Sequence, residues 1–359
     1  LAMTRAGLAP VLAGRRQESL QALLADIAGS APFGREPSIA VGDVDDPSSV
    51  AALVTSPDDV LVTTVGPFSR LGQPALDAAI AAGCTYLDCT GEPTFIRHVF
   101  QDEGPRAQAS GARLLTAFGY DYVPGNLAGA LAIRDAVQAG TPPDRVEIGY
   151  FVRGTSGFSS GTKASMGVMV GHIPFAFTGG QIVDGFGEVE SFDVDGEQWD
   201  ALPLGASEHF ALPRIDAHLT GVGVYLGWAG KATRAAHAAA KAAATAARVP
   251  LAGRAVSGAM SAAMSRGGDV TGQGPSADER AGARTLVVAR TLDPVGRRLS
   301  HVTLEGPSPY DLTAELLAWG AAMAATGQVH GTGALGPVDG FGLAALESGC
   351  ADMGLVRVS

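Results

Sequence analysis

The chain has 359 residues, of which 46% are hydrophobic and 17% are charged, and its formal net charge is -11 at pH 7. This length allows two domains with a sizeable core. The acidic balance argues against binding to nucleic acid or to anionic membrane surfaces, both of which need basic patches. No apolar run approaches the roughly 20 residues of a membrane span, so no integral membrane segment is expected.

Cysteines and histidines indicate neither a disulfide framework nor a metal site. The three cysteines are Cys84, Cys89 and Cys350, too few to cross-link a chain of this length. Cys84 and Cys89 face opposite sides of a predicted strand and are expected to be buried thiols. The histidines form no H-x-x-x-H or Cys/His cluster, so no metal is expected. A reducing, cytoplasmic compartment fits this usage.

Strands and helices alternate in the first third of the chain. Short apolar runs predict strands at residues 10–14, 38–41, 60–65, 85–89 and 113–117. Helix-compatible segments between them lie at 19–28, 47–54 and 73–82. This alternation is typical of an α/β fold with a doubly wound parallel sheet and crossover helices.

The pattern changes after Pro124. Strands are expected at 146–153, 180–193, 284–291 and 299–304, and the last two are joined as a hairpin around Asp293–Gly296. Residues 229–264 and 310–325 are expected to be helical. Residues 267–281 are expected to form an exposed loop. We therefore expect a nucleotide-binding domain at 1–125, an inserted mixed α+β substrate or dimerisation domain at 126–306, and a segment at 307–359 that returns to the first domain.

The glycine turn of a dinucleotide fold has no counterpart at the start of this sequence. In such folds a G-x-G-x-x-G turn after the first strand holds the pyrophosphate. Residues 1–7 read as the end of a helix, and 10–14 as the second strand. We expect the first strand and its turn to lie upstream of Leu1, with the given sequence incomplete. The G-x-G-x-x-G at 331–336 follows a predicted helix and is interpreted as a surface or pocket-edge loop.

Two arginines close the strand at 10–14. An acidic residue there would bond a ribose 2′-hydroxyl, whereas Arg15 and Arg16 suit a 2′-phosphate and favour NADP over NAD. The alternative is that both are exposed arginines at a helix start.

Two further strand ends carry candidate cofactor-binding residues. Asp43 and Val44 follow the strand at 38–41, where an aspartate commonly borders the adenine; a helix N-cap shared with Asp45 and Asp46 is the alternative. The segment Val65-Gly66-Pro67-Phe68 ends the strand at 60–65. Gly66 allows close approach of a cofactor and Pro67 fixes the turn, which could also be purely structural.

Three segments resemble the saccharopine dehydrogenase-like oxidoreductases. They are TTVGPFSRLGQPALDAAIAAGCTYLDCTGEP, FGYDYVPGNL and RTLVVARTLDPVGRRLSHVTLEGPSPYDLTAELL. The chain is similar above all to the bacterial branch that includes trans-acting enoyl reductases. The resemblance implies an N-terminal Rossmann domain, a mixed α/β second domain and a nicotinamide cofactor, usually NADP(H). Family members open with a glycine-rich strand–turn–helix that this sequence lacks.

The resemblance also points to a reacting loop. Tyr120 and Asp121 match a family loop near the nicotinamide, and either could donate a proton or bind substrate. An Asx-turn beside a packed tyrosine is the alternative. Asp88 is expected to cap the turn at Thr90. The loop at 154–165, with Lys163 as its one cation, could polarise a substrate carbonyl or serve as a hinge.

The expected reaction is hydride transfer from NADPH to an activated C=C or C=O bond. Between 154 and 211 the one Lys or Arg is Lys163, against several apolar residues, which favours an apolar or carrier-bound acyl substrate unless those residues are core. A saccharopine-type amino-acid dehydrogenase would need clustered cations. A non-catalytic Rossmann sensor or scaffold is a further alternative, and a homodimer is left open.

Overall fold

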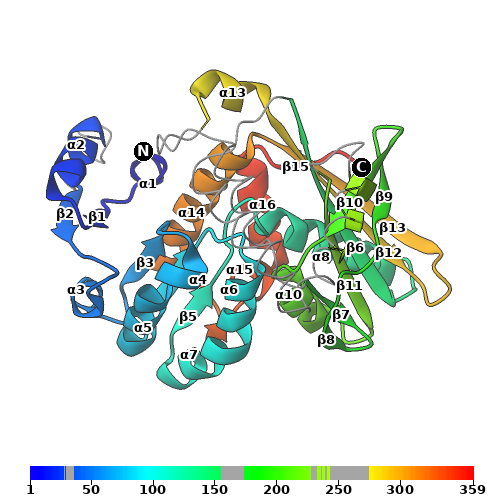
Figure 1. Cartoon of the computed structure of the whole chain (residues 1–359), viewed down its shortest axis with the longest axis horizontal. Helices are drawn as coiled ribbons and strands as arrows, with labels where there is room; N and C mark the ends of the chain where they lie inside the picture. The colour runs from blue at the N-terminus through cyan, green and yellow to red at the C-terminus, as the bar shows by residue number, and fades with distance from the viewer. Residues whose placement is uncertain are drawn as a thin grey trace. The chain divides into compact units, whose positions relative to one another are not determined.

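A computed structural model describes residues 1–27, 29, 36–154, 174–227, 233–235, 237–238, 241–242 and 275–359. The chain forms two compact units (Figure 1). Unit 1 comprises Leu1–Thr90, Phe95–Val123 and Tyr310–Met353. Unit 2 comprises Gly91–Thr94, Pro124–Pro309 and Gly354–Ser359. Among the residues described, no helix has the length and apolar character needed to cross a membrane.

Unit 1 contains two parallel sheets. One pairs β1 (Val11–Gly14) with β2 (Ser38–Val41). The other has the order β14-β5-β4-β3, with β3 at Val60–Thr63, β4 at Thr85–Asp88, β5 at Arg113–Leu115 and β14 at Gly333–Ala334. The predicted parallel α/β character and all five strand positions are confirmed. One continuous sheet is not seen, because no backbone ladder joins β1 to β3 in the described part of the chain.

Helices follow the strands of unit 1 as the sequence predicts. They are α1 (Ala2–Arg5), α2 (Gln17–Ile27), α3 (Pro47–Ala51), α4 (Phe68–Leu71), α5 (Gln73–Ala82), α6 (Pro93–His98), the π-helix η1 (Val99–Glu103), α7 (Gly104–Ser110), α14 (Pro309–Ala325), α15 (Pro337–Phe341) and α16 (Leu343–Asp352). Helix α5 shows why the prediction succeeds. It has a proline in its first turn, buries Leu76 and Ile80, and ends at Gly83, whose φ of +69° favours glycine.

Helix α14 anchors the core of unit 1. The apolar side chains of Leu312 and Leu316 on this helix are fully buried. The Trp319 ring is stacked parallel to the Phe118 ring, with ring centroids 6.3 Å apart, and its centroid lies 4.7 Å from that of Phe341. The last part of the chain therefore packs against the loop that follows β5, which the sequence anticipated only as a return to the first domain.

Unit 2 is built on a nine-stranded mixed sheet. Its main order is β15-β13-β12-β6-β11-β10-β9; in addition β7 pairs with β11, and β8 pairs with β7. The strands are β6 (Arg145–Arg153), β7 (Phe175–Thr178), β8 (Gln181–Asp184), β9 (Glu190–Val194), β10 (Glu197–Pro203), β11 (Gly221–Leu226), β12 (Arg284–Leu292), β13 (Arg298–Gly306) and β15 (Val356–Arg357). Its named helices are α8 (Val123–Gln138), α10 (Glu208–Ile215) and α13 (Ala277–Gly282). The predicted β12–β13 hairpin and its turn are confirmed.

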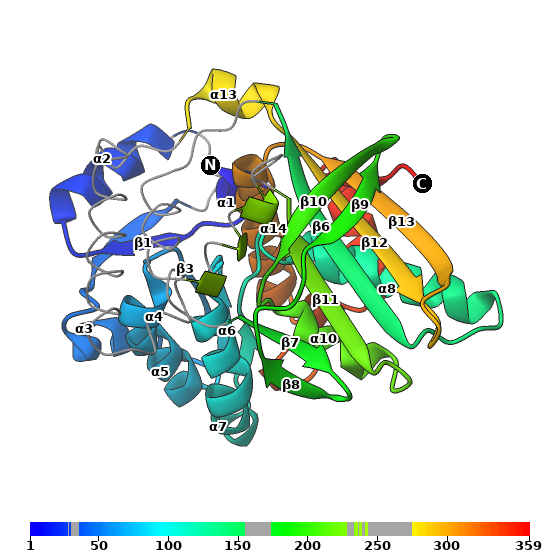
Figure 2. The same cartoon turned by 45° about the vertical axis from the view of Figure 1, so that its right-hand side comes forward.

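Helices α8 and α10 lie on one face of this sheet (Figure 2). Added at Gly129 of α8, a Cβ would lie 2.6 Å from Leu212 of α10 and 3.5 Å from Ile148 of β6, so the three elements are in close contact. The opposite face buries Phe151, Phe192 and further apolar residues beside Trp199 and Tyr225.

Two element predictions in unit 2 are wrong. The strand expected at 180–193 is two strands, β8 and β9, because the glycines between them break the extended run; Gly187 has a φ of +56°. The loop expected at 267–281 ends in helix α13, which begins with a capping box between Ser276 and Glu279. Of the helix expected at 229–264, residues 233–235, 237–238 and 241–242 are helical and the rest lies outside the described residues.

Candidate functional site

The predicted site residues of unit 1 follow the carboxyl ends of parallel strands. In the four-stranded sheet, Thr63 lies opposite Asp88, and Leu87 lies opposite Leu115. The segments after β3, β4 and β5 therefore meet at one edge, where ligands bind in open α/β sheets. Arg15, Arg16, Asp43 and Val44 follow the carboxyl ends of β1 and β2, which are paired at Gly14 and Val41.

Arg15 and Arg16 are both exposed directly after β1. Within the described ranges their side chains make no ion pair or hydrogen bond with the protein. The alternative of exposed arginines at a helix start describes their geometry, since α2 begins at Gln17. Two unpaired guanidinium groups in this position can also bind a phosphate.

Asp43 and Asp46 have different structural roles. The Asp43 backbone N–H donates to Ser49 Oγ at 2.8 Å, and its carboxylate accepts from the Asp45 N–H at 3.1 Å. Asp46 is the N-cap of α3 and accepts from the Ser48 N–H at 3.2 Å. The N-cap alternative therefore applies to Asp46, and Asp43 and Val44 remain partly exposed beyond β2.

The segment Val65–Phe68 divides between surface and core. Val65 is 42% exposed, and Gly66 beside it is exposed as well. The Gly66–Pro67 peptide is cis, and Pro67 precedes α4. Phe68 is buried and packs on Phe95 with ring centroids 5.6 Å apart. Only the first part of the segment therefore presents atoms to a ligand.

Asp88 ties the ends of β4 and β5 together. Its Oδ1 accepts from the Thr90 N–H at 2.8 Å, which confirms the predicted cap of that turn. Oδ1 also accepts from the Ala117 N–H at 2.9 Å, and Oδ2 accepts from Thr116 Oγ1 at 2.8 Å. Burial raises the pKa of Asp88, while these hydrogen bonds act in the opposite direction. The links to Thr116 and Ala117 depend on strand register and were not predicted.

The loop after β5 turns sharply at its first residues. Ala117 has a φ of +56°, a left-handed conformation that is uncommon for alanine. The Tyr122 N–H donates to the Ala117 carbonyl at 2.7 Å, closing the loop. The Tyr120 N–H donates to Thr313 Oγ1 of α14 at 3.0 Å. A Cβ at Gly119 would lie 2.8 Å from Thr313 Cγ2, so only glycine allows this approach.

Tyr120 and Asp121 lie in this loop at the carboxyl edge of the sheet. Tyr120 is 3% exposed, and Asp121 is partly buried. Burial raises the pKa of Asp121 to about 7, so its carboxyl can hold a proton near neutrality. The same surroundings raise the pKa of the Cys89 thiol to about 12, by burial and then by the charges of Asp88 and Asp121. Cys89 is therefore not a nucleophile at neutral pH.

Three other sequence-based expectations have different outcomes. The loop at 154–165, with Lys163, lies outside the described residues beyond Gly154. Phe175, one of the apolar residues used to infer the substrate, is buried against His209 and Phe210, as core. The G-x-G-x-x-G at 331–336, expected as a surface or pocket-edge loop, is exposed at Gly331 and Thr332, but Gly333 and Ala334 form the buried strand β14 beside β5.

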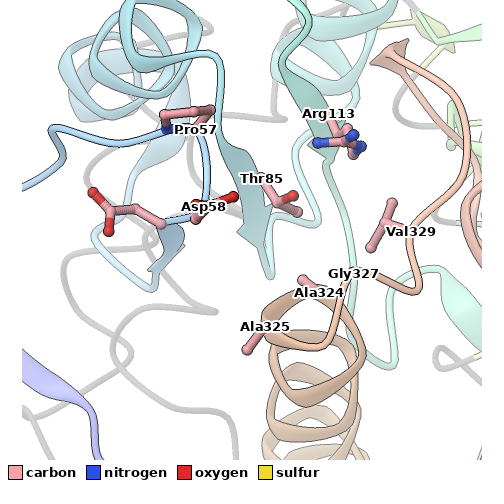
Figure 3. A pocket seen from close by; sticks show the side chains of 9 residues that line it. Pro57, Asp58, Thr85, Arg113, Ala324, Ala325, Gly327 and Val329 are labelled. Atoms are coloured by element: carbon pink, nitrogen blue, oxygen red, sulfur yellow. The ribbon is translucent and has the colours of Figure 1, made fainter.

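A cavity of about 210 Å³ lies at the opposite edge of the same sheet (Figure 3). It is bordered by the residues that begin β4 and β5, by the segment before β3 and by the end of α14; these include Asp58, Asp59, Thr85, Arg113, Ala325 and Gly327. The cavity is thus separate from the carboxyl-edge site. In the described ranges no group of three or more His, Cys, Asp or Glu side chains could hold a metal ion.

Comparison with known proteins gives partial matches in sequence. No protein-family model matches the chain. A Mycobacterium tuberculosis protein classed with the trans-acting enoyl reductases is 36% identical over 156 residues, which cover 43% of this chain and 36% of that protein. A saccharopine dehydrogenase-like oxidoreductase of Arabidopsis thaliana is 34% identical over 116 residues, 32% of this chain and 25% of the relative. The matched segments span about a third or less of each relative.

Solved structures match over nearly the whole chain. Saccharopine dehydrogenase (L-Glu forming) from Saccharomyces cerevisiae has a TM-score of 0.57 at 13% identity, with 99% of this chain and 96% of that chain covered. Homospermidine synthase from Legionella pneumophila, solved in complex with NAD, has a TM-score of 0.54 at 7% identity, with 90% and 81% covered. At these identities the likeness concerns the fold alone.

Proposed function

Because the chain is a distant homologue of the saccharopine dehydrogenase-like and trans-acting enoyl reductase proteins, we propose that it is an NADP(H)-dependent oxidoreductase. Its substrate in this proposal is an apolar or carrier-bound acyl compound with an activated C=C or C=O bond. The observation that carries the proposal is the position of Asp121, a carboxyl with a pKa of about 7 at the carboxyl edge of a parallel sheet.

The cofactor proposal assigns a role to each strand end. Arg15 and Arg16 would hold the 2′-phosphate, Asp43 with Val44 would border the adenine, and the segment Val65–Pro67, in which Val65 and Gly66 are exposed, would allow close approach of the cofactor. NADPH supplies a hydride when bound. The NAD bound in the Legionella homospermidine synthase structure supports a dinucleotide in this fold, but the preference for NADP rests on the arginines.

The open edges of β1 and β3 support a further part of this proposal. In the described part of unit 1, β1 pairs with β2 alone and β3 pairs with β4 alone. A strand between them would join the two sheets into one doubly wound Rossmann sheet. A glycine-rich turn after that strand would then hold the pyrophosphate. This strand and its turn stay a prediction.

Proton transfer is assigned to the loop after β5. In the proposal, Asp121 in its protonated form donates a proton to the substrate atom that becomes basic on reduction, and Tyr120 packs beside it as a substrate-binding residue. Burial raises the pKa of the Asp121 carboxyl to about 7, close to the operating pH, as general acids require.

Cofactor binding is tested by titrating the protein with NADPH and with NADH while nicotinamide fluorescence is recorded. We expect NADPH to bind about tenfold or more tightly than NADH, and a double change of Arg15 and Arg16 to Ser to remove that preference. Arg97→Ser is the control, since Arg97 is a partly exposed arginine on α6 that donates to Gln101 Oε1 and lies in none of the proposed cofactor-binding segments. Absence of NADPH binding would overturn the proposal.

A second candidate is a saccharopine-type amino-acid dehydrogenase. It is favoured by the fold match over 99% of the chain to saccharopine dehydrogenase. Oxidation of saccharopine with NAD⁺ or NADP⁺ would establish it. Binding of NADPH without turnover of either substrate class would favour a redox sensor or scaffold.

We also propose that residues 126–306 serve substrate binding or dimerisation and that the protein acts in the cytoplasm. Sedimentation of the protein tests whether it forms a homodimer.

A further inference from the structure

We propose that Asp88 is a positioning residue of this site, whose buried carboxylate holds the loop that carries Tyr120 and Asp121. The inference deepens the proposed function and rests on it, since the role of Asp121 as proton donor is part of that proposal. Asp88 itself does not face the reacting atoms in this account.

Each oxygen of the Asp88 carboxylate has a separate task. Oδ1 accepts two backbone N–H groups, one from Thr90 after β4 and one from Ala117 after β5. Oδ2 accepts the Thr116 hydroxyl. Asp88 is fully buried, so these bonds are shielded from water and are charge-assisted when the carboxyl is ionised. One side chain thereby fixes the ends of two neighbouring strands.

The loop needs this support because its first residue is strained. The left-handed conformation of Ala117 costs about 1–2 kcal/mol for an L-residue other than glycine. Its N–H is held by Asp88, and its carbonyl accepts the Tyr122 N–H. The Phe118 N–H donates to the backbone carbonyl of Asp88 at 2.6 Å, so three consecutive residues, 116 to 118, are bound to Asp88.

A second anchor holds the other part of the loop. Tyr120 is bound through its N–H to Thr313 Oγ1, and Gly119 packs against the same threonine. Asp121 lies between Tyr120, which is bound to Thr313, and Tyr122, whose N–H is bound to the carbonyl of Ala117, so the location of Asp121 follows from both anchors. Loss of the Asp88 anchor would displace Asp121, and a displacement of about 1 Å can lower a rate by up to about 100-fold.

The experiment compares Thr116→Val with Thr116→Ser, because the first removes the hydroxyl that donates to Asp88 and the second keeps it. Asp88→Asn is the companion variant, since an amide keeps one acceptor for the two N–H groups. The readouts are NADPH affinity, kcat and KM for trans-2-dodecenoyl N-acetylcysteamine thioester, the pH profile of kcat, and hydrogen exchange of residues 116–122.

We expect Thr116→Val to lower kcat by about 10- to 100-fold with NADPH affinity unchanged within about twofold, and to speed exchange of residues 116–122. Thr116→Ser should restore both. Asp88→Asn should lower kcat but retain the pH limb of Asp121. The inference is overturned if Thr116→Val and Asp88→Asn leave kcat and loop exchange unchanged. It is also overturned if Asp88→Asn abolishes that pH limb, because Asp88 would then be the proton donor.

Failure of the inference and failure of the proposed function are distinguishable. A wild-type protein that neither binds NADPH nor reduces the thioester contradicts the proposed function, and with it the role of Asp88 in catalysis. Hydrogen exchange then still shows whether Asp88 holds the loop. An active wild type whose Thr116→Val variant is equally active contradicts the inference alone.

Discussion

The Asp121 carboxyl links the stability of the protein to pH. Its pKa is raised to about 7 by burial, whereas an aspartate in an unfolded chain titrates near 3.9. Between these two values the folded state holds a proton that the unfolded state has released, so the free energy of unfolding falls as pH rises through this window. Below the window the penalty is absent, and above it the penalty is complete.

We expect Asp121→Asn to raise the free energy of unfolding at pH 8 by on the order of 1–2 kcal/mol, since Asp121 is only partly buried. At pH 4 the variant and the wild type should be nearly equal. Urea unfolding at the two pH values measures the difference. An equal gain at both pH values would show that the effect does not come from ionisation of Asp121.

The same carboxyl predicts the pH profile of the proposed reaction. As a general acid, Asp121 must be protonated, so kcat should decline as pH rises above about 7. Asp121→Asn should lower kcat by about 100-fold and remove this decline. Steady-state kinetics from pH 5 to pH 9, with stability checked at each pH, provides the measurement. A profile that Asp121→Asn leaves unaltered would exclude Asp121 as the donor.

Gly119 gives a residue-scale test of packing at the site. An added Cβ would lie 2.8 Å from Thr313 Cγ2 and 3.1 Å from Thr313 Oγ1, the acceptor for the Tyr120 N–H. We expect Gly119→Ala to cost about 1–3 kcal/mol of unfolding free energy. Gly185→Ala is the matched control, because no atom lies within 4 Å of its added Cβ. Equal urea midpoints for the two variants would contradict the close contact.

At the scale of elements, the start of helix α8 is bound to β6 and α10 of unit 2. The Gly125 N–H donates to Tyr150 Oη at 2.8 Å, and Tyr150 Oη donates to Glu208 Oε1 at 2.5 Å. Glu208 is fully buried and Tyr150 is 1% exposed. The Asn126 amide donates to Ser207 Oγ at 3.0 Å beside them. Three elements of unit 2 therefore meet in one polar network.

Removing the Tyr150 hydroxyl should therefore destabilise unit 2. Tyr150→Phe leaves the Gly125 N–H without its acceptor and takes a donor from buried Glu208, at a cost of about 1–3 kcal/mol. Tyr225→Phe is the control, since the Tyr225 hydroxyl makes no hydrogen bond within the described ranges. Thermal unfolding of the two variants measures the contrast. A Tyr150→Phe melting temperature equal to that of the control would contradict the role of this network.

Element prediction from sequence succeeded where the local signal was strong. Helix α5 has a proline in its first turn and ends at a left-handed glycine. The β12–β13 hairpin turns at an Asp-Pro-Val-Gly sequence. It failed where glycines had two interpretations. At 180–193 the glycines divide one predicted strand into two. Gly333, in contrast, lies within a strand, where the backbone of Gly104 comes so close that a Cβ at residue 333 would lie 3.1 Å from its carbonyl oxygen.

At the scale of the whole molecule, strand order and register decided what the sequence could not show. The order of parallel strands placed the candidate residues at strand ends, so their common edge could be expected from the alternation alone. The contact of Asp88 with Thr116 and Ala117 depends on the pairing of β4 with β5, which no local pattern specifies. The division of unit 1 into two separate parallel sheets likewise depends on strand pairing. The cofactor roles of Arg15, Arg16, Asp43 and Val44 stay predictions.

The central claim is hydride transfer from NADPH to an activated double bond, and isotope transfer tests it most directly. NADPH deuterated at both C4 positions of the nicotinamide is incubated with the protein and trans-2-dodecenoyl N-acetylcysteamine thioester or the matching 3-oxo thioester, and the product is analysed by mass spectrometry. We predict one deuterium in the reduced product and a rate that falls in Asp121→Asn. NADPH binding without deuterium in either product would contradict the account.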